Sequence, residues 1–97
     1  MKKIAIIGAG LTGATIARIC AEHDIIVDIF DKRANLGGMC ADEMRIDGYY
    51  KSEFGPHIFH TSSEAVWNFV NRFAEFLPCR HVVCAKTDIG ILPWPIT

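Results

Sequence analysis

Hydrophobic residues near the start of the chain form two short apolar runs with a helical pattern between them. Residues 4–7 are continuously apolar and end in a glycine turn, which is typical of a strand buried on both faces in a parallel sheet. Residues 11–22 carry small and apolar side chains on one side, which predicts a helix packed closely on that strand. Residues 25–30 form a second apolar run, which ends at Asp31. The pattern therefore predicts a βαβ unit.

Two antiparallel elements are predicted farther along the chain. Residues 44–54 alternate around a turn at Asp47 and Gly48, which indicates short strands or an extended connection. Residues 81–86 and 89–92 predict two strands joined by a turn at 87–88. We expect this second pair to be a β-hairpin.

A helix is predicted over residues 63–77, between these two elements. Thr61 and Glu64 fit the capping box that often precedes a helix, and Pro78 would end it. Its apolar residues recur at helical spacing, which predicts a core-facing stripe made of Val66, Phe69, Val70, Phe73 and Leu77.

The glycines that follow the first predicted strand, in GAGLTG, fit the dinucleotide-binding fingerprint. Gly8 would make the tight turn, Gly10 would let the backbone approach a pyrophosphate, and Gly13 would let the helix pack on the strand. The helix N-terminus would supply free N–H groups and a partial positive charge for the phosphates. The fold class we predict is α/β: a Rossmann-like βαβ unit with an added helix and β-hairpin. Residues 1–97 would be the N-terminal part of an FAD/NAD(P)-binding domain.

An acid and a second glycine pair refine the choice of cofactor. Asp31 lies close to the spacing of about 20 residues at which an acid binds the ribose hydroxyls and disfavours the extra phosphate of NADP. Gly37 and Gly38 follow it, and backbone that passes near a diphosphate needs residues without a Cβ. This arrangement resembles the extended fingerprint of two-dinucleotide-binding flavoproteins. It favours FAD over NAD.

Composition and charge exclude several classes of partner. The chain has 97 residues, of which 51% are hydrophobic and 22% charged, and its net charge is −1. That profile is typical of a globular domain and gives no basic surface for nucleic acid and no polybasic arm for a membrane. No apolar run is long enough for a spanning helix. Glycines interrupt the apolar start of the chain, so we do not expect a secretory signal.

The four cysteines form no recognisable motif. Cys20, Cys40, Cys79 and Cys84 make no CxxC pair and have no histidine at zinc-finger spacing. We therefore expect reduced thiols, a cytoplasmic location and no metal site.

The combined pattern resembles the N-terminal portion of the UDP-galactopyranose mutases. The resemblance runs through essentially the whole chain and rests on GAGLTGA, DKRANLGGMCADE, FGPHIFHT and the hairpin before LPWPIT. It implies an isomerase that interconverts UDP-galactopyranose and UDP-galactofuranose for cell-surface polysaccharides and needs reduced FAD. The family's reaction uses the flavin N5 as the nucleophile toward the sugar, through an N5–sugar adduct. No catalytic side chain is therefore expected in this chain.

The resemblance also implies which residues bind cofactor and substrate. It assigns four segments to FAD. The phosphate turn is Gly8, Gly10, Leu11, Thr12 and Gly13, and the ribose acid with its neighbour is Asp31 and Lys32. The glycine-pair segment is Gly37, Gly38 and Met39, and the flavin contact is Pro56, His57 and Ile58. The Pro56 carbonyl would accept a hydrogen bond from the reduced flavin N5–H. His81 would lie at the edge of the pocket for UDP-galactose.

Several alternatives stay open from the sequence. His57 and His60 could contact the flavin or fix their loop, and a metal site with both is not expected because no third ligand has suitable spacing. The function could instead be an FAD-dependent oxidoreductase of the amine-oxidase type, or a non-catalytic nucleotide-binding remnant. The apolar, proline-rich LPWPIT leads us to expect a longer protein, and we expect no catalysis from these residues alone. Oligomeric state is left open.

Overall fold

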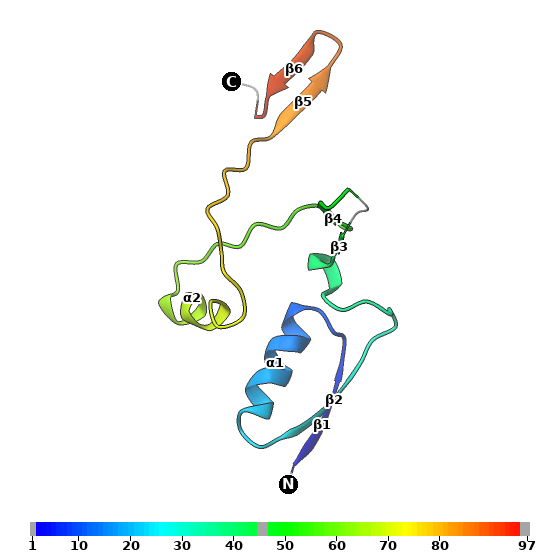
Figure 1. Cartoon of the computed structure of the whole chain (residues 1–97), viewed down its shortest axis with the longest axis vertical. Coiled ribbons are helices and arrows are strands. Elements are labelled where there is room, and N and C mark those ends of the chain that lie inside the picture. Colours follow the sequence, from blue (N-terminus) through cyan, green and yellow to red (C-terminus); the bar gives the residue numbers. More distant parts are fainter. Residues whose placement is uncertain (1, 45–46, 96–97) are drawn as a thin grey trace. The chain divides into compact units, whose positions relative to one another are not determined.

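The computed structural model describes residues 2–44 and 47–95 (Figure 1). The chain divides into two compact units, Met1–His57 and Ile58–Thr97.

The first unit begins with the predicted βαβ unit. Strand β1 (Lys3–Ile7) is followed by helix α1 (Leu11–Ala21) and strand β2 (Ile26–Phe30). The two strands pair in parallel, with Lys3 opposite Ile26 and Ile7 opposite Phe30 (Figure 1). In-register parallel pairing brings the carboxyl ends of both strands to the same edge, next to the start of α1. The βαβ prediction is confirmed, with boundaries within one residue.

Helix α1 packs on the strands through its smallest residues. Gly13 and Ala17, one turn apart, are its buried residues, while Leu11 is 60% exposed. A Cβ atom on Gly13 would collide with the carbonyl oxygen of Gly8, so only glycine allows the helix to lie this close to the turn. Gly13 is thus the residue that sets the distance between α1 and the end of β1.

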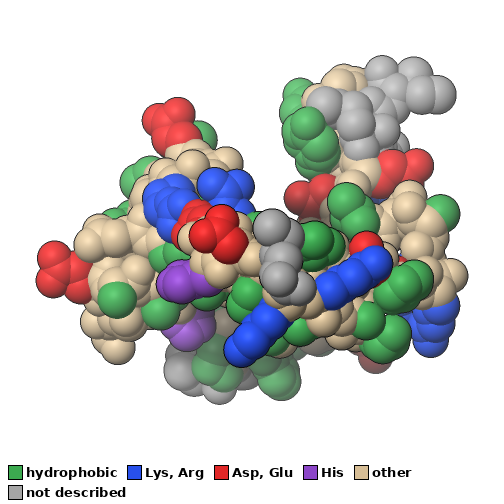
Figure 2. Space-filling view, turned by 90° about the horizontal axis from the view of Figure 1, so that it is seen from below, with side chains coloured by type: hydrophobic (Ala, Val, Ile, Leu, Met, Phe, Trp, Pro, Cys, Tyr) green, Lys and Arg blue, Asp and Glu red, His purple; other side chains and the backbone are tan. Residues whose placement is uncertain are grey.

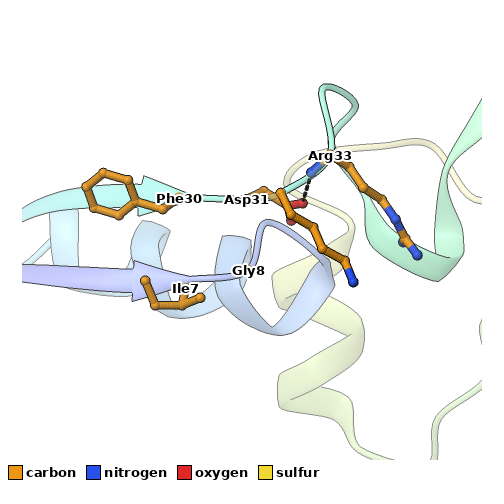
Figure 3. Close-up of a pocket in the computed structure, with 6 residues that line it drawn as sticks. Ile7, Gly8, Phe30, Asp31 and Arg33 are labelled. Atoms are coloured by element: carbon orange, nitrogen blue, oxygen red, sulfur yellow. Dashed lines mark hydrogen bonds between the residues drawn. The ribbon is translucent and has the colours of Figure 1, made fainter.

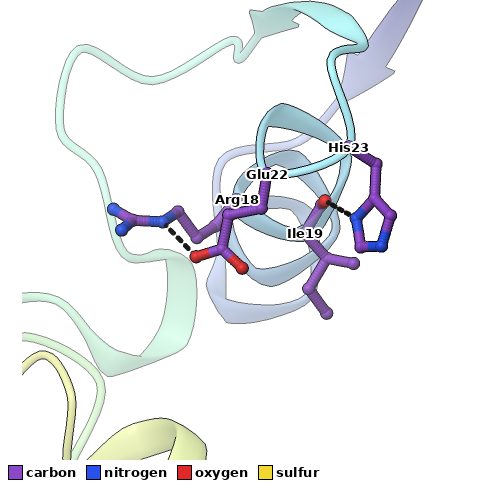
Figure 4. Close-up of polar contacts among 4 residues, drawn as sticks. All are labelled: Arg18, Ile19, Glu22 and His23. Carbon is purple, nitrogen blue, oxygen red and sulfur yellow. Dashed lines mark hydrogen bonds and ion pairs between the residues drawn. The ribbon is translucent and has the colours of Figure 1, made fainter.

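Polar contacts satisfy the C-terminal end of α1 (Figure 4). Arg18 Nε donates to Glu22 Oε1 at 2.9 Å, one turn along the helix. The ring Nδ1 of His23 lies 2.8 Å from the Ile19 carbonyl oxygen, one of the last acceptors that the helix leaves unbonded. The His23 ring therefore caps the end of α1 that lies away from the glycine turn, and the Arg18–Glu22 ion pair lies along the last turn.

The expectation that the first strand is buried on both faces is wrong for the described residues. The β1–β2 sheet has two strands, and α1 contacts it. Ile7 is accordingly 84% exposed and Ile29 43% exposed. Figure 2 shows hydrophobic side chains at the surface among the charged ones. The apolar run predicts burial, but burial also needs neighbouring layers, which these residues do not supply.

A turn of 3-10 helix and a short ribbon complete the first unit. The 3-10 helix η1 (Gly38–Cys40) follows the glycine pair, and strands β3 (Asp42–Met44) and β4 (Tyr50–Ser52) pair antiparallel. This confirms short strands around residues 47–48, although residues 45–46 lie outside the described part of the chain.

The helix of the second unit is shorter than predicted. Helix α2 (Glu64–Val70) is capped by Ser63, whose hydroxyl accepts from the Val66 N–H at 3.2 Å. Thr61 instead accepts from the Ser63 N–H, so the predicted capping box is wrong. The helix ends at Asn71, whose side-chain amide donates to the Trp67 carbonyl at 2.7 Å. The Trp67 carbonyl also accepts from the Asn71 backbone N–H, but the N–H groups of Arg72 and Phe73 bond carbonyls three residues back, so regular α-helical bonding ends well before Pro78.

The predicted hairpin at the end of the chain is confirmed with a shifted turn. Strands β5 (Cys84–Thr87) and β6 (Gly90–Pro93) pair antiparallel, with Thr87 opposite Gly90. Residues 88–89 form the turn, one position later than expected. Gly90 has a φ of +124°, a conformation that glycine supplies without strain. His81 therefore lies before the strand and not within it.

We expect Gly13→Ala to destabilise the protein, although Gly→Ala inside a helix ordinarily stabilises by about 1 kcal/mol. The added methyl group would push α1 away from the Gly8 carbonyl, at a cost of about 1–3 kcal/mol. Urea unfolding of both proteins measures the difference.

Gly10→Ala is the matched control for this change. Its Cβ would lie 3.8 Å from Gly38 Cα, an ordinary contact, so its stability should stay within about 1 kcal/mol of the parent. Equal stability of the Gly13→Ala and Gly10→Ala variants would contradict the tight-packing account.

Candidate cofactor site at the end of the parallel strands

The turn after β1 is held to the end of β2 by two hydrogen bonds. Gly8 has a φ of +109°, and its N–H donates to the Phe30 carbonyl at 2.7 Å. The N–H of Ala9 donates to Asp31 Oδ2 at 2.8 Å. The aspartate that follows β2 is therefore part of the glycine turn's own support.

The second glycine pair lies directly on the first glycine turn. The Gly37 N–H donates to the Ala9 carbonyl at 2.9 Å, and Gly10 and Gly37 form an isolated parallel bridge. A Cβ on Gly38 would come within 3.1 Å of Gly10 Cα, which is too close for an ordinary side chain. The backbones of both glycine segments are therefore in contact, with no side chain between them. A side chain at Gly38 would push the two segments apart.

The N-terminus of α1 opens onto this place. Gly10 is its N-cap, no side chain caps it, and its first turn carries no acidic residue. The N–H groups of Leu11, Thr12 and Gly13 have no partner within the helix, because the first N–H groups of any helix lack one. With the partial positive charge of the helix end, they form a site suited to an anionic group such as a phosphate.

Asp31 is held in its ionised form. The hydrogen bond from the Ala9 N–H lowers the pKa of Asp31 below its ordinary value of 3.8, and the bond from the Arg33 N–H at 2.7 Å lowers it further. The nearby charges of Arg33 and Lys32 act in the same direction, and partial desolvation opposes them. Because each carboxylate oxygen accepts from one backbone N–H, each keeps capacity for a further donor such as a ribose hydroxyl.

A pocket of about 290 Å³ lies beside this carboxylate (Figure 3). Its lining comes from the last residue of β1, the first turn glycine, and the end of β2 with the residues after it: Ile7, Gly8, Phe30, Asp31, Lys32 and Arg33. Ligand pockets commonly start near 300 Å³, so this pocket suits one portion of a dinucleotide and not the whole.

The remaining predicted residues are not brought into this pocket by any described contact. Met39 lies in η1 and is 57% exposed. Pro56 and His57 lie in coil at the end of the first unit, and both are exposed. Ile58 and His81 belong to the second unit, where both are exposed. Their proposed roles stay predictions, as does any role of the exposed His60.

Two contributors to the site were not singled out by sequence reasoning. Ala9 acts through its N–H and carbonyl, which join Asp31 and Gly37, so its side chain gives no signal. Arg33 binds Asp31 through its backbone and lines the pocket. The sequence did carry a signal for this contact. Aspartate side chains often accept a hydrogen bond from the backbone N–H two residues later, and Arg33 lies two residues after Asp31.

Other kinds of site are not seen among the described residues. All four cysteines are free thiols, and no three His, Cys, Asp or Glu side chains gather in residues 2–44 or 47–95 as a metal site would require. Neither described helix has the length and apolar character needed to cross a membrane.

Comparison with known proteins places the chain among nucleotide-binding domains and close to sugar-nucleotide mutases. The family described as NAD(P)-binding Rossmann-like domain matches residues 6–73. The chain is 52% identical to a dTDP-fucopyranose mutase of Escherichia coli over 96% of its length, and 41% identical to a "Probable UDP-galactopyranose mutase" of Klebsiella pneumoniae over 98%. It is 40% identical to a UDP-galactopyranose mutase of Mycoplasma genitalium over 86%. It covers 26%, 25% and 21% of these relatives, respectively.

Titration should show the hydrogen bonds to Asp31 directly. We expect the Asp31 carboxyl ¹³C resonance to titrate with a midpoint below 3.8, and the amide resonances of Ala9 and Arg33 to follow the same midpoint. Because the folded-state pKa is depressed, the stability it contributes is present above the unfolded-state pKa and is lost as the pH falls through the folded-state pKa.

The matched control for this titration is Asp28→Asn, within β2. Asp28 only pairs with Lys3 at 3.0 Å between exposed side chains, a kind of contact that contributes little stability. Asp31→Asn should therefore reduce the loss in free energy of unfolding that the parent shows as the pH falls. Asp28→Asn should leave that loss unchanged. An Asp31 midpoint at or above 3.8 would refute the hydrogen-bonding account.

Proposed function

The chain belongs to the family of NAD(P)-binding Rossmann-like domains, and on that premise we propose that it is the FAD-binding part of a UDP-galactopyranose mutase. The observation that carries the proposal is the contact between two glycine segments at the open N-terminus of α1. Three chain segments there combine bare backbone, unbonded N–H groups and an ionised acid. These are the groups that a dinucleotide with a diphosphate and a ribose requires.

Each part of the candidate site has a defined task in this proposal. The N–H groups of Leu11, Thr12 and Gly13 would bind the pyrophosphate, and Asp31 would accept from the ribose hydroxyls, with Lys32 beside it. Because Gly37 and Gly38 carry no side chain, they would let the diphosphate lie against the backbone. Met39 would follow them along the cofactor.

FAD is proposed over NAD because of the second glycine pair. It is fixed to the first turn by the Gly37 N–H, so any diphosphate at α1 would meet both segments. A single Rossmann glycine turn can bind NAD without such a pair. FAD would supply the nucleophilic nitrogen for exchange at the anomeric carbon of the sugar. The chain's residues would bind and orient it, and Pro56, His57 and Ile58 are proposed to lie near its ring.

The substrate of the complete enzyme would be a sugar nucleotide. UDP-galactose is proposed from the UDP-galactopyranose mutases, with His81 at the edge of its pocket. A dTDP-fucose substrate is the second candidate, because the relative with that printed activity has the higher identity of 52%. The two sugars differ in the hydroxyl at C6. A site built to bond that hydroxyl would discriminate strongly, and an apolar site weakly. We place the enzyme in the cytoplasm, where such activated sugars are made.

An assay of the complete protein that carries this chain tests the proposal. With its flavin reduced by dithionite, it should convert UDP-galactofuranose to UDP-galactopyranose, as measured by chromatography of the nucleotides. The same preparation, given dTDP-fucofuranose, separates the two substrate candidates. Flavin absorption recorded during turnover should stay that of the reduced form. Substrate-dependent reduction of oxidised flavin would instead identify an oxidoreductase, and bound flavin with no conversion of either sugar would exclude a mutase.

Gly10→Ala should weaken FAD binding while leaving the fold intact. The methyl group would displace the pyrophosphate and cost at least one charge-assisted hydrogen bond, so we expect about tenfold or greater loss of affinity in calorimetry. Unchanged affinity would mean that the diphosphate does not lie at this turn.

A further inference from the structure

Arg33 contacts two different groups, one with its backbone and one with its side chain. Its N–H donates to Asp31 Oδ1 at 2.7 Å. Its guanidinium lies over the ring of Phe54, 4.9 Å from the ring centroid, which is a cation–π contact. Arg33 and Phe54 both belong to the first compact unit, which also contains Asp31 and the glycine turn. The contact is therefore internal to the unit that carries the candidate site.

The side chain of Arg33 extends away from the carboxylate that its own backbone holds (Figure 3). The hydrogen bonds from the Ala9 and Arg33 N–H groups lower the pKa of Asp31 most, and the charge of the Arg33 guanidinium lowers it less. This order agrees with a cation that is not hydrogen-bonded to the carboxylate. The guanidinium is thus directed to the Phe54 ring, while Asp31 is held by backbone groups alone.

The place of this guanidinium bears on which nucleotide the site can bind. Asp31, Lys32 and Arg33 line the same pocket. In dinucleotide-binding domains an acid here bonds the ribose 2′-hydroxyl, whereas an arginine nearby accommodates the 2′-phosphate of NADP. This pocket contains both residue types, and the description of the family as NAD(P)-binding covers both kinds of nucleotide. Selection between them therefore depends on where the Arg33 side chain is held.

Phe54 is well placed to hold it. The ring follows strand β4 by two residues, and the N–H of the preceding Glu53 donates to the Ala41 carbonyl at 3.2 Å, which fixes the backbone before the ring. Guanidinium groups are weakly hydrated and stack readily on aromatic faces. Phe54 is 38% exposed, and a cation–π contact at an exposed site gives about a two- to fivefold preference for the stacked position.

We propose that Phe54 is a positioning residue for nucleotide specificity: it holds the Arg33 guanidinium away from Asp31, so that the site binds a ribose with a free 2′-hydroxyl and discriminates against a 2′-phosphate. This inference rests on the proposed function, since it takes the site after β1 and β2 as the dinucleotide site. It adds that selection against NADP-type nucleotides does not come from Asp31 alone. Phe54 acts through Arg33 and does not itself contact the nucleotide.

Calorimetry on the complete protein that carries this chain, prepared free of flavin, tests this role. The probes are ADP-ribose and 2′-phospho-ADP-ribose, which share the diphosphate and differ only in the 2′-phosphate. The parent should prefer ADP-ribose. Phe54→Leu should raise the affinity for the 2′-phosphorylated probe relative to ADP-ribose about two- to fivefold, because the guanidinium no longer has to leave a ring to reach the phosphate.

A second substitution shows whether this gain passes through Arg33. Combining Arg33→Met with Phe54→Leu should abolish the gain, because no guanidinium remains to bind the 2′-phosphate. Phe54→Tyr keeps the ring face and should retain the preference of the parent. Phe54→Met has an apolar side chain without a ring face, and it serves if Phe54→Leu does not fold.

Tyr50→Leu is the matched control. Tyr50 is a 70% exposed aromatic residue on β4, in the same unit as Phe54. Its replacement should leave the ratio of the two affinities unchanged. General damage to the site would weaken both probes alike, so the ratio reports on the 2′-phosphate and not on folding.

The outcomes separate this inference from the proposed function. An unchanged ratio for Phe54→Leu, or a gain that survives Arg33→Met, would overturn the positioning role and leave the proposed function standing. If the parent binds ADP-ribose but not FAD, the proposed function fails, and the ratio still decides the role of Phe54. A parent that binds neither ADP-ribose nor FAD would overturn both.

Discussion

The peptide groups of Ala9 form the junction on which the first unit depends. Its N–H donates to Asp31 after β2, and its carbonyl accepts from Gly37, so both neighbouring segments are joined at one residue. Ala9 is 6% exposed, one of the few well-buried positions among the residues that the structure describes. A buried peptide that lost either partner would leave an unsatisfied polar group, which costs about 1–3 kcal/mol. The glycine turn, Asp31 and the second glycine pair are therefore joined to one another through Ala9.

This junction also holds the two glycine segments and the acid in one arrangement. The glycines let two backbones meet closely, and the same lack of side chains leaves room for an anionic group at the start of α1. The Asp31 carboxylate is oriented by two N–H groups and remains ionised.

Sequence patterns predicted the local parts of this arrangement well. The run of apolar residues, the glycine spacing and the acid at its end lie close together in the chain, and the βαβ unit follows from them because each element is specified by its own residues. The prediction of α2 was poorer. Its apolar spacing continues to Leu77, but the N–H groups of Arg72 and Phe73 bond carbonyls three residues back, and the α-helix ends at Asn71. Periodicity of the apolar residues does not show where the backbone hydrogen bonds change.

The sequence by itself determined the fold class, the dinucleotide fingerprint and the identity of the acid, because these depend on residue type and short spacing. Tertiary structure decided what the acid and the glycine pair bind, since Ala9 lies 22 residues before Asp31 and acts only through its backbone. It also decided which groups the two phenylalanine rings of FGPHIFHT contact, the Arg33 guanidinium for Phe54 and the Trp67 ring for Phe59. Contacts between distant backbone groups and ring faces carry no local pattern, so they become visible only when the chain is folded.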